Sequence, residues 1–190
     1  MPMRHATENR PNASNGNRPE PWLGAAAGAL GGVAGSWAMV RFNHALGRTE
    51  DAETPQQHRR RSASPNETDS TISDEPASIQ VASLAAEAVT HDRLDDREKR
   101  IGGSLVHYMF GAAVGAAYGA AAEYRQGATA LAGLPFGTGV WIAADELGLP
   151  LLGLARNPKD YPPQRHLAAF ASHLVFGLAA EAVRRQLRGR

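Results

Sequence analysis

The sequence contains no cysteine, which excludes disulfide bonds, thiolate metal sites and thiol catalysis. It also lacks an excess of either charge, because 20 Lys and Arg residues against 19 Asp and Glu leave a net charge of +1. This balance gives no overall electrostatic attraction for nucleic acid. Hydrolase, nucleotide-binding and phosphate-cradling motifs are missing too, since Gly31-Gly32 lies in apolar helical sequence and follows no strand. We therefore expect no enzymatic activity, no cofactor, no metal site and no nucleic-acid partner.

Charge is also missing from long stretches of the chain. The mean hydropathy of −0.35 averages two kinds of sequence, since residues 1–21 and 47–100 are polar and the remainder is nearly free of charge over long stretches. A helix that crosses a bilayer needs about 20 mainly apolar residues. Such segments lie at 22–40 and 101–122, from about 128 to 154 with an interruption at Asp145-Glu146, and at 167–183. The sequence predicts an all-α fold, a bundle of four transmembrane helices packed through Gly and Ala.

A soluble helical bundle is the alternative. It would need a charged outer face on each helix, and the first two apolar segments are apolar all round. The first segment is not expected to be a cleavable signal peptide, because it follows a 21-residue polar tail and is longer than a typical signal core. The predicted protein is multi-pass, and its predicted partner is the lipid bilayer. A homo-oligomer or another membrane protein as partner stays open.

The predicted organisation has four parts. Residues 1–21 form a polar tail, 22–46 the first transmembrane helix and its end, 47–100 a polar insert, and 101–190 the other three helices with a basic C-terminal end. The insert has almost no large apolar residues in its first part and is predicted to be largely disordered. Its last part, 79–97, is interpreted as an amphipathic helix able to lie at the membrane interface.

Glycine is frequent inside the apolar segments, often at intervals of four residues. Glycine costs about 1 kcal/mol relative to alanine in a water-exposed helix. Within a membrane, small residues four apart instead let two helix backbones approach closely. The predicted packing positions are Gly28, Gly32, Gly111, Gly115, Gly119 and Gly177.

One polar pattern occurs twice within this apolar sequence. His107-x-x-Phe-Gly111 leads in steps of four to Glu123, and His173-x-x-Phe-Gly177 leads to Glu181. Steps of four follow one stripe of a helix, so these polar groups should point into helix contacts. The recurrence suggests two helical hairpins related by duplication.

Ionisable residues within a span are functional candidates because they are costly in lipid. The candidate intramembrane cluster is His107, Asp145, Glu146 and His173. Histidine titrates near neutral pH, so this cluster would suit a proton or ion pathway. A haem bound by two histidines is a further alternative, for which tight glycine packing leaves little room. The favoured hypothesis is that the histidines hold neighbouring helices in register through hydrogen bonds.

The acids Glu123 and Glu181 lie near span ends, next to Arg125 and to Arg184 and Arg185 respectively. Interfacial ion pairs are sufficient to explain them. The predicted function is that of a small integral membrane protein with a structural or accessory role. A small proton or ion channel or transporter is the alternative.

Three stretches of the chain resemble one known family. Residues 173–188, residues 107–123 and the sequence Pro150-Leu-Leu-Gly153-Leu154, followed by a loop with proline, are similar to the YagU-like family of bacterial inner-membrane proteins. The long polar insert is where this sequence departs most from that family. The resemblance implies a location in the bacterial inner membrane and implies no reaction.

Overall fold

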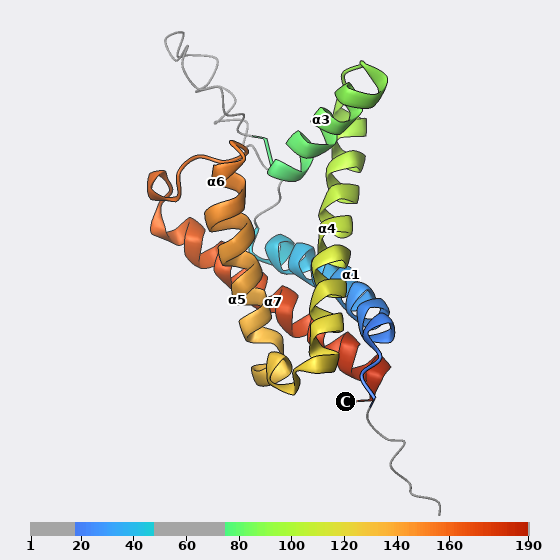
Figure 1. The fold of residues 1–190 in the computed structure, drawn as a ribbon. Coiled ribbons are helices and arrows are strands. Elements are labelled where there is room, and N and C mark those ends of the chain that lie inside the picture. Colours follow the sequence, from blue (N-terminus) through green and yellow to red (C-terminus); the bar gives the residue numbers. More distant parts are fainter. Residues whose placement is uncertain (1–17, 48–74, 190) are drawn as a thin grey trace, which may run out of the picture.

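The computed structural model describes residues 18–47 and 75–189, and every regular element within them is helical (Figure 1). This confirms the all-α prediction. The polar tail to residue 17 and residues 48–74 of the insert, predicted to be disordered, lie outside the described residues. The elements are α1 (Pro21–Ala45), α3 (Ala77–Thr90), α4 (Asp96–Tyr124), η1 (Gln126–Gly133), α5 (Leu134–Trp141), η2 (Ile142–Gly148), α6 (Leu149–Leu151), η3 (Pro158–Asp160) and α7 (Pro163–Arg188).

Within the described part of the chain, three helices are long and apolar enough to cross a membrane, namely α1, α4 and α7. They cover the first, second and fourth predicted spans. Large apolar side chains such as Trp37 and Leu30 of α1 and Met109 of α4 are exposed on their surfaces. Exposed apolar side chains all along such helices are expected where lipid surrounds them, so these features indicate a membrane protein.

The third predicted span, from about 128 to 154, is continuously helical only from Leu134 to Leu151, where three elements follow one another. Before them, Ala130, Leu131 and Ala132 have non-helical dihedral angles, so the predicted helix begins later than expected. Right-handed helical dihedral angles at Ile142 and Leu149 join α5 to η2 and η2 to α6. The middle element, η2, is a π-helix, a wider turn than the α-helix. Pro150 follows it and has no N–H for the carbonyl of Glu146, which explains why the regular α-helical ladder is interrupted here.

Helix α1 packs against α4 through glycine on both sides. A Cβ atom built on Gly28 would lie 2.8 Å from Cα of Gly119, and one on Gly32 would overlap the carbonyl oxygen of Gly111. Later residues of α1 thus meet earlier residues of α4, so the two helices run antiparallel. A side chain on either glycine would push the two backbones apart.

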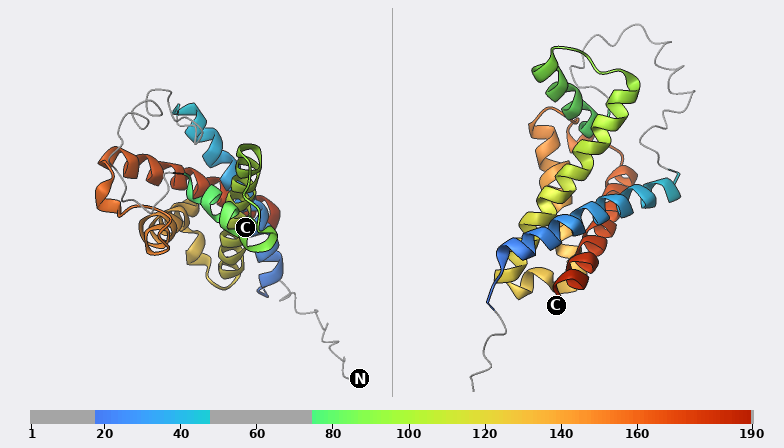
Figure 2. Two further views of the ribbon diagram at one scale, coloured as in Figure 1. Left: turned by 90° about the horizontal axis from the view of Figure 1, so that it is seen from above. Right: turned by 90° about the vertical axis from the view of Figure 1, so that its right-hand side faces the viewer.

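Helix α1 also packs against α7, and again the two helices are antiparallel. A Cβ atom on Gly31 would lie 2.5 Å from the carbonyl oxygen of Ala180, and one on Gly35 would lie 2.7 Å from that of Phe176. The ribbon of α1 accordingly crosses those of both α4 and α7 (Figure 2). Because α4 and α7 are each antiparallel to α1, they run in the same direction.

Helix α5 packs on α7 in the same manner. Gly133 lies against Gly177, and Gly137 lies against the backbone of His173. The structure therefore contains three antiparallel glycine-packed pairs, α1 with α4, α1 with α7 and α5 with α7, of which the first and the third correspond to the two predicted hairpins. Whether they arose by duplication stays a hypothesis.

The end of the insert differs from the expected single helix over 79–97. Helix α3 ends at Thr90, and His91 adopts a left-handed conformation with φ of 61°. Helix α4 begins at Asp96 because Asp95 and Glu98 form a capping box, in which each side chain accepts the other's backbone N–H. The two helices form a hairpin, with α3 packed on the first turns of α4.

Candidate functional site

A buried carboxylate lies near the C-terminal end of α7. Glu181 is 1% exposed and accepts hydrogen bonds from Nε of Arg184 at 2.7 Å and Nε of Arg185 at 2.6 Å. The hydroxyl of Tyr118, on α4, also donates to this carboxylate, at 2.9 Å. A buried carboxylate needs such partners, because an unpaired charge away from water is costly. This cluster ties α7 to α4.

A second carboxylate is buried beside it, at the end of α4. The Glu123 side chain is 1% exposed and accepts from Nε of Arg188 at 2.9 Å. The backbone N–H of Glu20, just before α1, also donates to it at 3.1 Å. The sequence had suggested a neighbouring arginine such as Arg125, whereas Arg188 is 65 residues away. Ends of α1, α4 and α7 thus meet in one charged layer.

A separate cluster of polar side chains, around His173, lies on the side of the bundle core away from Glu123 and Glu181. Nδ1 of His173 is 2.9 Å from the carbonyl oxygen of Ala169 and 3.7 Å from Oδ2 of Asp145. The separation of 3.7 Å is too long for a hydrogen bond, so the two side chains form an ion pair only when the imidazole is protonated. Nε2 of His107 is buried without a hydrogen-bond partner. Of the four predicted cluster residues, the structure thus brings Asp145 and His173 together.

Glu146, the fourth predicted cluster residue, has a different partner. Its Oε1 is 2.7 Å from Nδ1 of His166, and Nε2 of that histidine is 2.8 Å from the carbonyl oxygen of Pro158. His166 was not a candidate because the fourth span was predicted to begin at residue 167, one position later. Across residues 18–47 and 75–189, no three His, Asp or Glu residues are grouped closely enough to hold a metal ion.

An aromatic layer separates the two polar regions. The rings of Tyr118 and Phe136 stack with centroids 4.0 Å apart and planes at 9°, and Phe136 contacts Phe176 at 5.6 Å. Along α7, Phe176 lies between His173 and Glu181. The aromatic layer therefore fills the core between the histidine–aspartate cluster and the charged layer.

Apolar helices of membrane length, packed through glycine around buried polar pairs, define a helical membrane protein. The chain belongs to the family described as "Protein of unknown function (DUF1440)", which matches residues 60–182 and thus more than half of the chain. The match includes Asp145, His173 and Glu181 and leaves out α1. No curated protein and no solved structure matches this chain.

Proposed function

We propose that this chain crosses the bacterial inner membrane four times and has a structural or accessory role there. One observation supports the proposed number of crossings. Helices α4 and α7 run in the same direction, because each is antiparallel to α1. If both span the bilayer, the connection between them must return across it. The helical stretch α5–η2–α6 provides that return.

The role is supported by how the polar groups are used. Glu123 and Glu181 are held by arginines that join helix ends, and the aromatic layer fills the core above them. Buried polar groups with bonded partners favour one arrangement of helices over others. Such an arrangement suits a compact scaffold better than an open water-filled passage.

Cysteine labelling tests the four crossings directly, since the chain has no native cysteine. Gly127 lies in the connection after α4, Lys159 lies in the connection before α7, and both are exposed. Four crossings place Gly127→Cys and Lys159→Cys on opposite faces, so a membrane-impermeant maleimide should label only one of them in sealed vesicles. Arg18→Cys should behave like Gly127→Cys. Labelling of Gly127→Cys and Lys159→Cys from the same side would refute the fourth crossing.

A proton pathway is the second candidate, and one observation favours it. Nε2 of His107 is buried without a hydrogen-bond partner, and Asp145 lies on a π-helix with its Oδ2 3.7 Å from Nδ1 of His173. Short π-helical turns occur often at functional sites, and intramembrane histidine and carboxylate pairs can relay protons.

Proton flux into liposomes containing the purified protein tests this candidate. His107→Gln and His173→Gln should abolish such flux, and the exposed His91→Gln should not; absence of flux in the parent protein would remove the candidate.

A further inference from the structure

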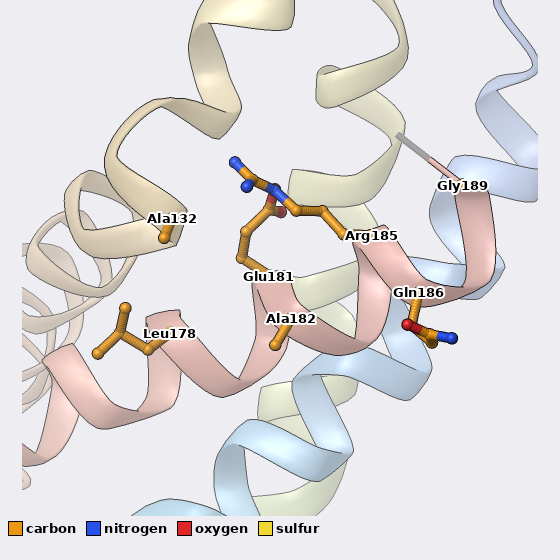
Figure 3. Close-up of a pocket in the computed structure, with 7 residues that line it drawn as sticks. All are labelled: Ala132, Leu178, Glu181, Ala182, Arg185, Gln186 and Gly189. Carbon is orange, nitrogen blue, oxygen red and sulfur yellow. The ribbon is translucent and has the colours of Figure 1, made fainter.

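A shallow pocket lies on the surface beside the C-terminal end of α7 (Figure 3). Its volume is about 620 Å³. Ala132, Leu178 and Ala182 give it an apolar floor, and Glu181, Arg185 and Gln186 give it a polar edge. The pocket thus has an apolar part and a charged part side by side.

The polar edge carries an exposed guanidinium group, that of Arg185. Glu181 is shared by Arg184 and Arg185, so one carboxylate faces two guanidinium groups. Arg184 is 3% exposed, whereas the Arg185 side chain is 48% exposed and lines the pocket. Two of the five N–H groups of Arg185 are used by Glu181 and by the carbonyl oxygen of Thr129. Arg188 is held on the other side by Glu123 and Glu20.

The position of the pocket fits an amphiphilic ligand. Leu178, 41% exposed, lies two turns before Arg185 on α7, towards the apolar middle of that helix. Arg185 lies in the last turn, where a spanning helix reaches the headgroup region of the bilayer. An apolar floor towards the membrane interior and a guanidinium at its edge match a phospholipid, whose phosphate is the kind of anion that arginine binds.

We propose that this pocket binds a phospholipid with an anionic headgroup. Its phosphate contacts Arg185, and one acyl chain lies on Leu178 and Ala182. The inference rests on the proposed membrane location. It does not depend on the number of crossings, so the labelling experiment above and the lipid experiment below can fail separately.

Native mass spectrometry of the delipidated full chain in detergent tests the proposal. Phosphatidylglycerol should bind more tightly than phosphatidylcholine, and inorganic phosphate should not bind. Arg185→Gln should weaken phosphatidylglycerol binding about tenfold, as expected for the loss of a charge-assisted hydrogen bond. Ala182→Phe should weaken binding of both lipids, because it fills the pocket and leaves every ion pair in place. Arg125→Gln, an exposed arginine outside the pocket, is the matched control and should bind as the parent does.

Two results would overturn the proposal. One is phosphatidylglycerol binding that is unchanged by Ala182→Phe, and the other is inorganic phosphate binding as tightly as the lipid. Arg185 also bonds Glu181, so a thermal unfolding scan must accompany Arg185→Gln. If that variant does not fold, Ala182→Phe decides the matter alone.

Discussion

At Gly115 the backbones of α4 and α1 are in contact. A Cβ atom there would overlap the carbonyl oxygen of Gly28 and lie 2.9 Å from Cα of Gly32. Backbone atoms cannot move aside as a flexible side chain can. Gly115→Leu should therefore lower the free energy of unfolding by at least the roughly 1–3 kcal/mol typical of overpacking. Denaturant-induced unfolding in mixed micelles would measure this change.

Gly139 provides the control for that substitution. It is also a helical glycine in apolar sequence, yet a Cβ atom on it would meet nothing within 4 Å. Gly139→Leu should leave the unfolding midpoint nearly unchanged. Equal destabilisation by both substitutions would show that the added bulk, and not the contact with α1, explains the effect, since leucine favours a helix more than glycine does.

Glu181 offers a second prediction for a single residue. Glu181→Gln removes the negative charge that Arg184, Arg185 and Tyr118 share and leaves two guanidinium groups facing each other. Breaking a buried ion pair costs about 3–5 kcal/mol, so the apparent Tm in detergent should drop strongly. Glu75→Gln, which alters an exposed pair with Lys99, should cost no more than about 1 kcal/mol. Comparable Tm values for the two variants would contradict the structural importance of Glu181.

Single residues also show where sequence reasoning succeeds. The glycine spacing indicated helix contacts because steps of four mark one helix face, and Gly28, Gly32 and Gly115 lie at such contacts. The pairing of Glu123 with Arg188 could not be predicted. It depends on which helices are neighbours in space, and a local arginine offered an equally plausible partner.

At the scale of elements, α3 depends on a small residue of α4. A Cβ atom on Gly103 would lie 2.6 Å from Cγ1 of Ile79 and 3.3 Å from its backbone nitrogen, so α3 packs closely where α4 presents glycine. Gly103→Leu should release α3 and increase amide hydrogen exchange across Ala77–Thr90, with little change in α7. The neighbouring Ser104 is exposed, so Ser104→Leu should leave exchange in α3 unchanged. Unaltered protection of α3 in Gly103→Leu would mean that other contacts hold it.

The long apolar helices were predictable because composition alone marks them. The residues at which these helices begin and end were harder to predict. The sequence did not reveal that α4 begins at Asp96, although the spacing of Asp95 and Glu98 is typical of a capping box. The π-helix could not be inferred either, since Pro150 allows several local solutions and packing selects among them.

At the scale of the whole molecule, α1, α4 and α7 expose many apolar side chains, whose contact with water is unfavourable. The protein should therefore stay with the membrane fraction after alkaline carbonate extraction, because spanning helices insert effectively irreversibly. A peripheral membrane protein extracted in parallel should be released. Recovery of this chain in the soluble fraction without detergent would contradict its assignment as a membrane protein.

The long-range pairing of Glu123 sets an order on biosynthesis. Arg188 follows Glu123 by 65 residues, so α4 leaves the ribosome before Arg188 has been made. The hydrogen-bond acceptor of Tyr118, Glu181, is also synthesised later, because it lies 63 residues further along the chain. The glycine contacts between α1 and α4 need nothing downstream, so this hairpin can form early. The arrival of α7 then adds the ion pair of Arg188 with Glu123 and the hydrogen bond of Tyr118 with Glu181, so the polar contacts between α4 and α7 form last.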